Sequence, residues 1–355
     1  MMIILSFLIG IATAFFTIFA IHILCYRRQR TRFQTVVGII MTIWALSCAK
    51  DLVLCLPGFY NDGVLDWVFI IDGWSAITYT VLVMEVVQPN WTTWRRLLLL
   101  ALPFGLLTMG FTIWPEREMV YAYSAFLWFY AWTVVIYGWV RMNRRLSYLR
   151  REYSNIDKID VSWLRPVFIF TIVGQLGWLF TSLYPTMLYD IIYYICIIIL
   201  WLFVLYYSWD FKPVVMEEPA ETDENAQVEI VRDTTPQDES RSPLSIGMLE
   251  KIVEEKKLYL NPSLTQNDLA HEMDTNRTYI SNYLSKQMNM TFYDYINMLR
   301  IKSAAMPLMK EHPEYKFEYV ASKSGFASIS TFRRAFVKVT GQTPSQYAAT
   351  IADQI

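Results

Sequence analysis

The sequence predicts an all-α protein in three parts: a seven-helix transmembrane bundle, an acidic disordered linker and a double helix-turn-helix domain. Hydrophobic residues make up 54% of the 355 residues, which is more than an ordinary soluble protein contains. The charges are also segregated, with 16 basic and 12 acidic residues in 1–212, 2 and 9 in 213–243, and 13 and 11 in 244–355. A net charge of −1 therefore hides a basic part, an acidic part and a slightly basic part.

Seven long apolar stretches account for residues 1–212. Each has roughly the 17–25 residues that a helix needs to cross a hydrocarbon core of about 30 Å. Helices of soluble proteins are rarely this apolar on every face. The first stretch has no positive segment before it, so we interpret it as a retained helix and not as a signal peptide. The stretches are 2–26, 33–56, 64–87, 97–114, 119–140, 167–184 and 187–209.

Basic residues lie in every second loop between these stretches. The loops at 27–32, 95–96 and 141–165 are rich in arginine, whereas the alternate loops contain only Arg117. Cytoplasmic loops carry the excess of Lys and Arg in membrane proteins. The sequence therefore predicts an integral protein of a bacterial inner membrane, with the N-terminus outside and everything after residue 209 in the cytoplasm.

Ionisable residues gather toward the predicted outer side of the bundle. Lys50 and Asp51 lie near the outer end of the second stretch, and Asp72 lies in the outer half of the third. Charges at this depth are costly and are usually paired or face a wet cavity. Two interpretations stay open: an ion pair with a structural role, or an outward-facing signal pocket lined by these three residues. Glu85, near the inner end, is expected to be exposed at the membrane interface.

No sequence pattern in the chain indicates catalysis or metal binding. There is no HExxH sequence, no glycine-rich phosphate loop and no nucleophile with a matching base. The four cysteines form no CxxC pair and the three histidines are scattered. We therefore expect no enzymatic activity, no metal site and no cofactor.

Residues 213–243 form the predicted linker. The segment is acidic, punctuated by proline and nearly without aromatic residues. Such a composition cannot bury enough apolar surface to fold alone. We therefore expect a disordered tether between the membrane part and residues 244–355.

The first predicted helix-turn-helix unit lies at about 265–287. Thr265, followed three residues later by Asp268, is typical of a capped helix start, and this helix should run to about residue 273. A three-residue turn and a second helix, at about 276–287, follow. Asp274 stands where the turn usually has a glycine, and aspartate is one of the few residues that tolerate a left-handed backbone.

The second predicted unit repeats this arrangement at about 318–340. Gly325 is placed to take a positive φ in the turn, and Ser328 is a good N-cap for the helix that follows. A connecting helix is predicted between the units, over about 291–312. Its inward-facing side chains should be Phe292, Tyr295, Ile296, Leu299 and Met306.

Residues 258–347 resemble the AraC/XylS-type DNA-binding domain. The resemblance rests on two units joined by one helix, on "DYINMLRIKSA" in the middle and on "GFASISTFRRAFVKVTGQTPSQY" at the end. It implies that the second helix of each unit enters the major groove of double-stranded DNA. It also implies core positions for Phe326, Phe332, Phe336 and Tyr347, and a final turn shaped by Gly341 and Pro344.

The remaining outward positions of the two second helices are the predicted DNA contacts. In this resemblance Arg334 pairs with guanine or with a phosphate, whereas Lys338 holds a phosphate. A solvated face is the alternative for Arg333 and Lys338. The predicted contacts are Asn276, Arg277, Thr278, Ser281, Asn282 and Lys286 in the first unit, and Ser328, Ile329, Ser330, Thr331, Arg333, Arg334 and Lys338 in the second.

The sequence departs from this family at Pro307. The family usually has a leucine there, whereas a proline removes a backbone donor and should kink the connecting helix. A kink would change the angle between the two reading helices. The net charge of the domain is also modest for a DNA-binding protein, although its basic residues are concentrated in 328–340.

Together these features predict a membrane-bound one-component transcription regulator. Residues 1–212 would sense a signal, and residues 244–355 would bind DNA beneath the membrane. Formation of a homodimer would be one means of control. Two alternatives stay open: a transporter whose cytoplasmic domain regulates its own expression, and a receptor that acts through protein partners.

Overall fold

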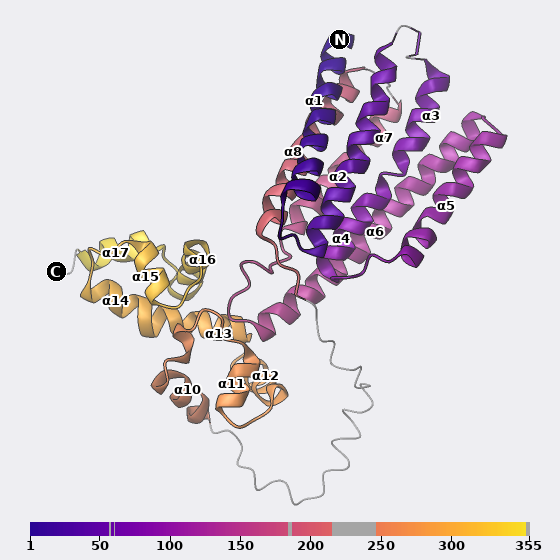
Figure 1. The fold of residues 1–355 in the computed structure, drawn as a ribbon. Helices are drawn as coiled ribbons and strands as arrows, with labels where there is room; N and C mark the ends of the chain where they lie inside the picture. The colour runs from indigo at the N-terminus through magenta and orange to yellow at the C-terminus, as the bar shows by residue number, and fades with distance from the viewer. Residues whose placement is uncertain (57, 60, 184–186, 215–245, 353–355) are drawn as a thin grey trace, which may run out of the picture. The chain divides into compact units, whose positions relative to one another are not determined.

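The computed structural model describes residues 1–56, 58–59, 61–183, 187–214 and 246–352 (Figure 1). The chain divides into two compact units. Unit 1 comprises Met1–Arg145 and Val161–Met216, and unit 2 comprises Leu146–Asp160 and Glu217–Ile355. Every regular element of the described residues is a helix, which confirms the all-α fold class. From residue 215 onward, the predicted linker lies outside the described residues.

Unit 1 is a bundle of long apolar helices that run side by side (Figure 1). Within the described residues, six helical stretches are long and apolar enough to cross a membrane, and Leu164–Gly174, the first part of α7, is a shorter apolar helix. The elements are α1 (Met2–Ile21), η1 (His22–Tyr26), α2 (Arg32–Asp51), η2 (Leu52–Cys55), α3 (Asp62–Gly73), α4 (Ala76–Val87), α5 (Trp94–Ile113), α6 (Arg117–Glu152), α7 (Leu164–Leu183) and α8 (Met187–Asp210).

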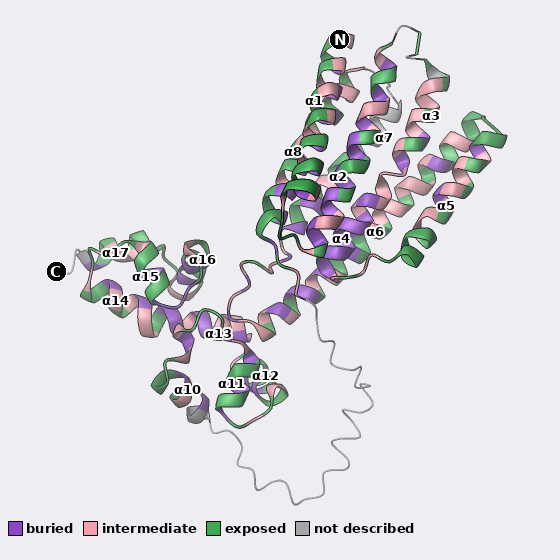
Figure 2. Cartoon of the chain, in the orientation of Figure 1, coloured by how far each residue is buried: buried purple, intermediate pink, exposed green. Residues whose placement is uncertain are grey.

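The outer surface of this bundle is apolar. Large side chains such as Ile3, Leu99 and Phe129 are 85%, 72% and 70% exposed, and exposed positions recur along the helices in Figure 2. A soluble monomer rarely exposes so much contiguous apolar surface. The burial pattern is therefore the one that a hydrocarbon solvent would produce, and it suggests a membrane protein.

The third predicted span lies in the membrane-length stretch Gly63–Val87, which is interrupted after Gly73 and so forms α3 and α4. The hydroxyl of Tyr123 donates to the carbonyl oxygen of Ile70 at 2.9 Å, and the amide of Trp74 bonds instead to Ile71 at 3.2 Å. A side chain that takes a carbonyl from the helical ladder interrupts the helix. Gly73 permits this approach, because a Cβ there would lie 2.4 Å from the Tyr123 oxygen. The break between α3 and α4 follows from this contact.

The fifth predicted span extends far beyond its expected end. It was expected to stop near residue 140, whereas α6 continues to Glu152 and the expected loop begins only there. Residues 141–152 contain no proline or glycine and are rich in arginine, which favours helix. The last part of α6 belongs to unit 2.

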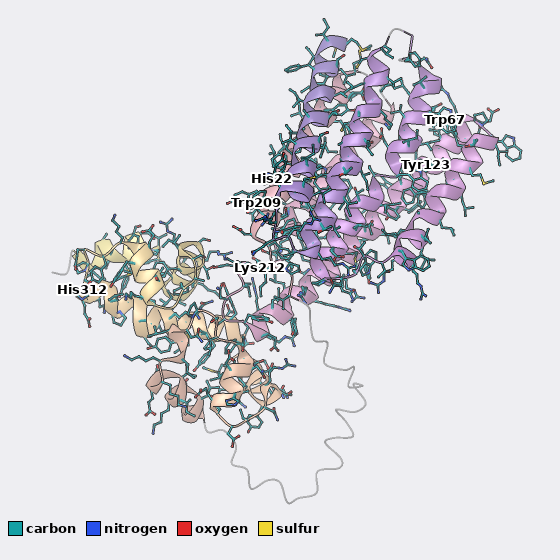
Figure 3. The ribbon with its side chains drawn as sticks, viewed as in Figure 1. His22, Trp67, Tyr123, Trp209, Lys212 and His312 are labelled. Atoms are coloured by element: carbon teal, nitrogen blue, oxygen red, sulfur yellow. The ribbon has the colours of Figure 1, made fainter. Side chains whose placement is uncertain are left out.

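Aromatic and charged side chains meet at one end of the bundle. The rings of His22 and Trp209, both labelled in Figure 3, are stacked with centroids 5.4 Å apart. The Arg27 guanidinium lies 4.6 Å from the centroid of the Trp209 ring. Glu85, expected to be exposed, is instead 1% exposed. Its carboxylate accepts hydrogen bonds from the backbone amides of Asn90 and Thr92 at 3.0 and 2.9 Å, so it holds the turn between α4 and α5.

Unit 2 contains ten short helices in its described residues. They form two apolar clusters, one on each side of the connecting segment α13–α14. The elements are α10 (Ile246–Glu255), η3 (Leu258–Leu260), α11 (Gln266–Glu272), α12 (Arg277–Lys286), α13 (Phe292–Leu299), η4 (Arg300–Ala305), α14 (Met306–Glu311), α15 (Phe317–Lys323), α16 (Ile329–Thr340) and α17 (Pro344–Ala352).

Pro307 lies just after an irregular stretch of the connecting helix. The π-helical turn η4 precedes α14, and Pro307 is the second residue of α14. The predicted connecting helix is confirmed, since α13, η4 and α14 follow one another without interruption from Phe292 to Glu311. Phe292, Tyr295 and Ile296 are buried as expected, whereas Met306 is only half-buried.

Candidate nucleic-acid interface

The first helix-turn-helix unit consists of α11 and α12. Thr265 and Asp268 form the predicted capping box at the start of α11. Asp274 takes the predicted left-handed conformation, with φ 50°, and turns the chain toward α12. Asn276 caps α12 by accepting a hydrogen bond from the amide of Tyr279 at 2.7 Å. Local side-chain chemistry therefore fixes where both helices begin.

The second unit consists of α15 and α16. Gly325 has φ 84°, and a Cβ there would lie 2.7 Å from the carbonyl oxygen of Tyr259, so only glycine fits this turn. Ser328 caps α16 by accepting from the amide of Thr331 at 3.2 Å. Phe332 and Phe336 are fully buried on the inner face of α16, and Tyr347 packs against Phe336.

The predicted DNA contacts divide by exposure. On α12, Ile280 and Leu284 are buried, so the opposite face points outward. On α16, Thr331 is 2% exposed and is the one predicted contact that is buried. The half-buried members are Arg277, Ser281, Ser328 and Ile329, and the exposed members are Asn276, Thr278, Asn282, Lys286, Ser330, Arg333, Arg334 and Lys338.

Ion pairs occupy several of the cationic positions. Lys338 Nζ lies 2.7 Å from Asp294 Oδ1, on the connecting helix. Arg334 Nη2 donates to the hydroxyl oxygen of Thr331 at 3.1 Å and lies 3.8 Å from Asp157 Oδ1. These side chains are largely exposed on the cationic side, so each pair contributes little to stability and can exchange for another anion.

Residues 153–157, after the end of α6, pack within unit 2. The amide of Ser154 donates to the carbonyl oxygen of Leu264 at 3.1 Å, and its hydroxyl donates to the same oxygen at 2.6 Å. Tyr153 forms a β-bridge with Thr265. No sequence pattern pointed to this packing, because it joins residues more than 100 positions apart through single side chains.

Arg300 fixes this segment to the domain. Its guanidinium donates to the carbonyl oxygens of Tyr259, Asn261 and Ser154, to the Asn297 side chain and to the Ser154 hydroxyl, at 2.7–3.2 Å. Burial lowers the pKa of Arg300 to about 10, so the side chain remains charged at neutral pH. A buried arginine with this many partners is a structural residue of the domain.

Lys50, Asp51 and Asp72 come together in unit 1. Lys50 Nζ lies 2.5 Å from Asp51 Oδ1 and 2.8 Å from Asp72 Oδ1. The hydroxyls of Tyr194 and Ser47 donate to Asp51 and Asp72 at 2.6 and 2.8 Å. The cluster joins α2, α3 and α8, and its members satisfy one another's hydrogen bonds.

One family model matches a region of unit 2. Residues 269–350 match the family model of a helix-turn-helix domain. The resemblance predicted from the sequence is confirmed for this C-terminal region, and it supports DNA binding by a transcription regulator.

Two similar proteins each match part of this chain. The Msm operon regulatory protein of Streptococcus mutans is 26% identical over 102 residues, which is 29% of this chain and 35% of that protein. An uncharacterized HTH-type transcriptional regulator of Staphylococcus aureus is 23% identical over 108 residues, which is 30% of this chain and 14% of that protein. The chain thus matches about a third or less of each relative's length. No solved structure matches it significantly.

Proposed function

We propose that this chain is a membrane-bound one-component transcription regulator. The observation that carries the proposal is the pair of capped helices, α12 and α16, whose outward faces are polar or basic while their inner faces build two apolar clusters. Such helices, in tandem units, suit the major groove of double-stranded DNA. The six apolar helices support a position in the lipid bilayer, which we propose to be a bacterial inner membrane with the N-terminus outside.

The signal would act on unit 1. We propose the cluster of Lys50, Asp51 and Asp72 as the responsive site, because three helices meet at these charges and a ligand or proton that altered one pairing would change how the helices pack. Asp72→Asn, in the full chain, should change the response of target transcription to envelope conditions. A variant that responds as the parent does would exclude the cluster as the sensor.

DNA binding is tested by mapping the genomic sites occupied by tagged full-length protein. We expect discrete promoter sites that are lost in the Arg277→Ala/Arg334→Ala variant, because both side chains lie on the outward faces of their helices. Random occupancy, or sites unaffected by the double variant, would contradict the proposal. If the double variant differed from the parent chain in solute uptake but not in promoter occupancy, the transporter alternative would be favoured instead.

A further inference from the structure

Two acidic side chains of one short segment lie on the predicted DNA contacts of both units. Glu152 Oε2 accepts from Arg277 Nη1 at 3.2 Å. Asp157 accepts a hydrogen bond from the Thr331 hydroxyl, and its Oδ1 lies 3.8 Å from Arg334 Nη2. All of these residues belong to unit 2. The segment 152–157 therefore reaches both second helices.

Each carboxylate contacts a side chain that comes from the first turn of a second helix. Arg277 is the first residue of α12, and Thr331 is the third residue of α16. The first turn of a helix carries unpaired N–H groups and partial positive charge, and DNA-binding proteins hold backbone phosphates at such ends. Glu152 and Asp157 thus present oxygen anions to the groups that would otherwise take phosphate oxygens.

We propose that segment 152–157 is a built-in competitor of DNA, which covers both second helices until DNA or a signal displaces it. This inference rests on the proposed function, since it assigns a regulator to the same surface. The surface of the two second helices is thus occupied either by segment 152–157 or by DNA. The two exclude each other because one set of cations cannot pair with both.

The packing of the segment is specific. Ser154, between the two acids, is fully buried and takes part in hydrogen bonds with Leu264 and Arg300. Ile156 is also buried, at 4% exposure. The two ion pairs, in contrast, are partly exposed on the arginine side, at 38% and 63%. Such pairs are weak singly, so an array of phosphates that engages several cations together can replace them.

The test compares the full chain in lipid nanodiscs with its Glu152→Gln/Asp157→Asn variant. The probe is a labelled random-sequence duplex at low salt, whose binding depends on phosphate contacts. The variant keeps side-chain size and removes both competing charges. We expect it to bind the duplex about tenfold more tightly than the parent chain.

The matched control is Glu311→Gln/Glu318→Gln. It removes the same charge from exposed positions on α14 and α15, so it measures the general effect of net charge. Equal affinities of the parent and the Glu152→Gln/Asp157→Asn variant, or an equal gain in the control, would overturn the competition while leaving DNA binding intact. Absence of binding by every protein would overturn the proposed function and the competition with it.

Hydrogen exchange provides a measurement without any substitution. The amide of Ser154, bonded to Leu264 at 3.1 Å, should exchange slowly in the free chain and faster when the duplex saturates the protein. Continued protection of residues 152–157 in the DNA complex would mean that DNA and the segment bind together, and the proposal would be wrong.

Discussion

The two second helices share one plan but differ in what they present outward. Counted from their caps, Asn276 and Ser328, the buried Ile280 of α12 corresponds to Phe332 of α16. At the next two positions α12 carries Ser281 and Asn282, where α16 carries Arg333 and Arg334. The buried positions thus match in kind, whereas at these two outward positions α12 has neutral hydrogen-bonding side chains and α16 has two arginines. We expect α16 to supply more of the phosphate attraction at these two positions, and Ser281 and Asn282 of α12 to contribute neutral readout.

The largest expected effect concerns the shared inner positions. Phe332→Ala should destabilise the second cluster by about 3–5 kcal/mol, because it removes a fully buried ring. Ile280→Ala should destabilise the first by about 2–5 kcal/mol. Hydrogen exchange of α12 and α16 amides in the solubilised chain would measure both. If Phe332→Ala loosened both helices equally, the two clusters would not be separate.

The outward difference is tested by Arg334→Ala and Asn282→Ala, which occupy matched positions. In a background with Asp157→Asn, which removes the ion pair at Arg334, we expect Arg334→Ala to weaken binding of a random duplex about tenfold and to lower the salt slope by about one. Asn282→Ala should leave the salt slope unchanged. Fluorescence anisotropy at several salt concentrations measures both, and equal slopes for the two variants would remove the distinction.

The caps should matter equally. Asn276→Ala and Ser328→Ala each remove an acceptor for a backbone amide, at 2.7 and 3.2 Å, and each should lower the stability of its unit by about 1 kcal/mol. Thermal unfolding followed by circular dichroism is a suitable measurement, with Ser285→Ala as a control on the body of α12. If only one of the two variants lost stability, the first turn of the other helix would have another source of stabilisation.

The smallest effects are expected at the last matched pair, Lys286 and Lys338. Lys338→Ala breaks an exposed ion pair with Asp294 and should change stability by less than about 1 kcal/mol. Each alanine variant should lower the salt slope of duplex binding by about one if the lysine meets a phosphate. An unchanged slope for Lys338→Ala would assign it to the solvated face, which the sequence left as an alternative.

Local chemistry explains what the sequence could predict. The caps at Thr265 and Ser328 and the left-handed turns at Asp274 and Gly325 depend on neighbours within a few positions, so the helix starts were readable. The break after Gly73 could not be predicted, because it depends on a hydrogen bond from Tyr123 to Ile70, which lies 53 positions away. The covering segment was missed for the same reason. Glu152 and Asp157 are single charges without a periodic pattern, and their partners lie 125 and 174 positions away.

That separation has a consequence for the order of synthesis. Asp157 leaves the ribosome 174 residues before Thr331, a delay of about 10–35 s at 5–20 residues per second. During this interval the segment that completes unit 2 has no partner, while the remaining helices of unit 1 are still being made. Unit 2 can therefore complete its fold only after residue 331 has been made, by packing against the segment 152–157 that was synthesised earlier. A nascent chain arrested before residue 300 would lack Arg300 and would have nothing to hold Ser154 through its carbonyl.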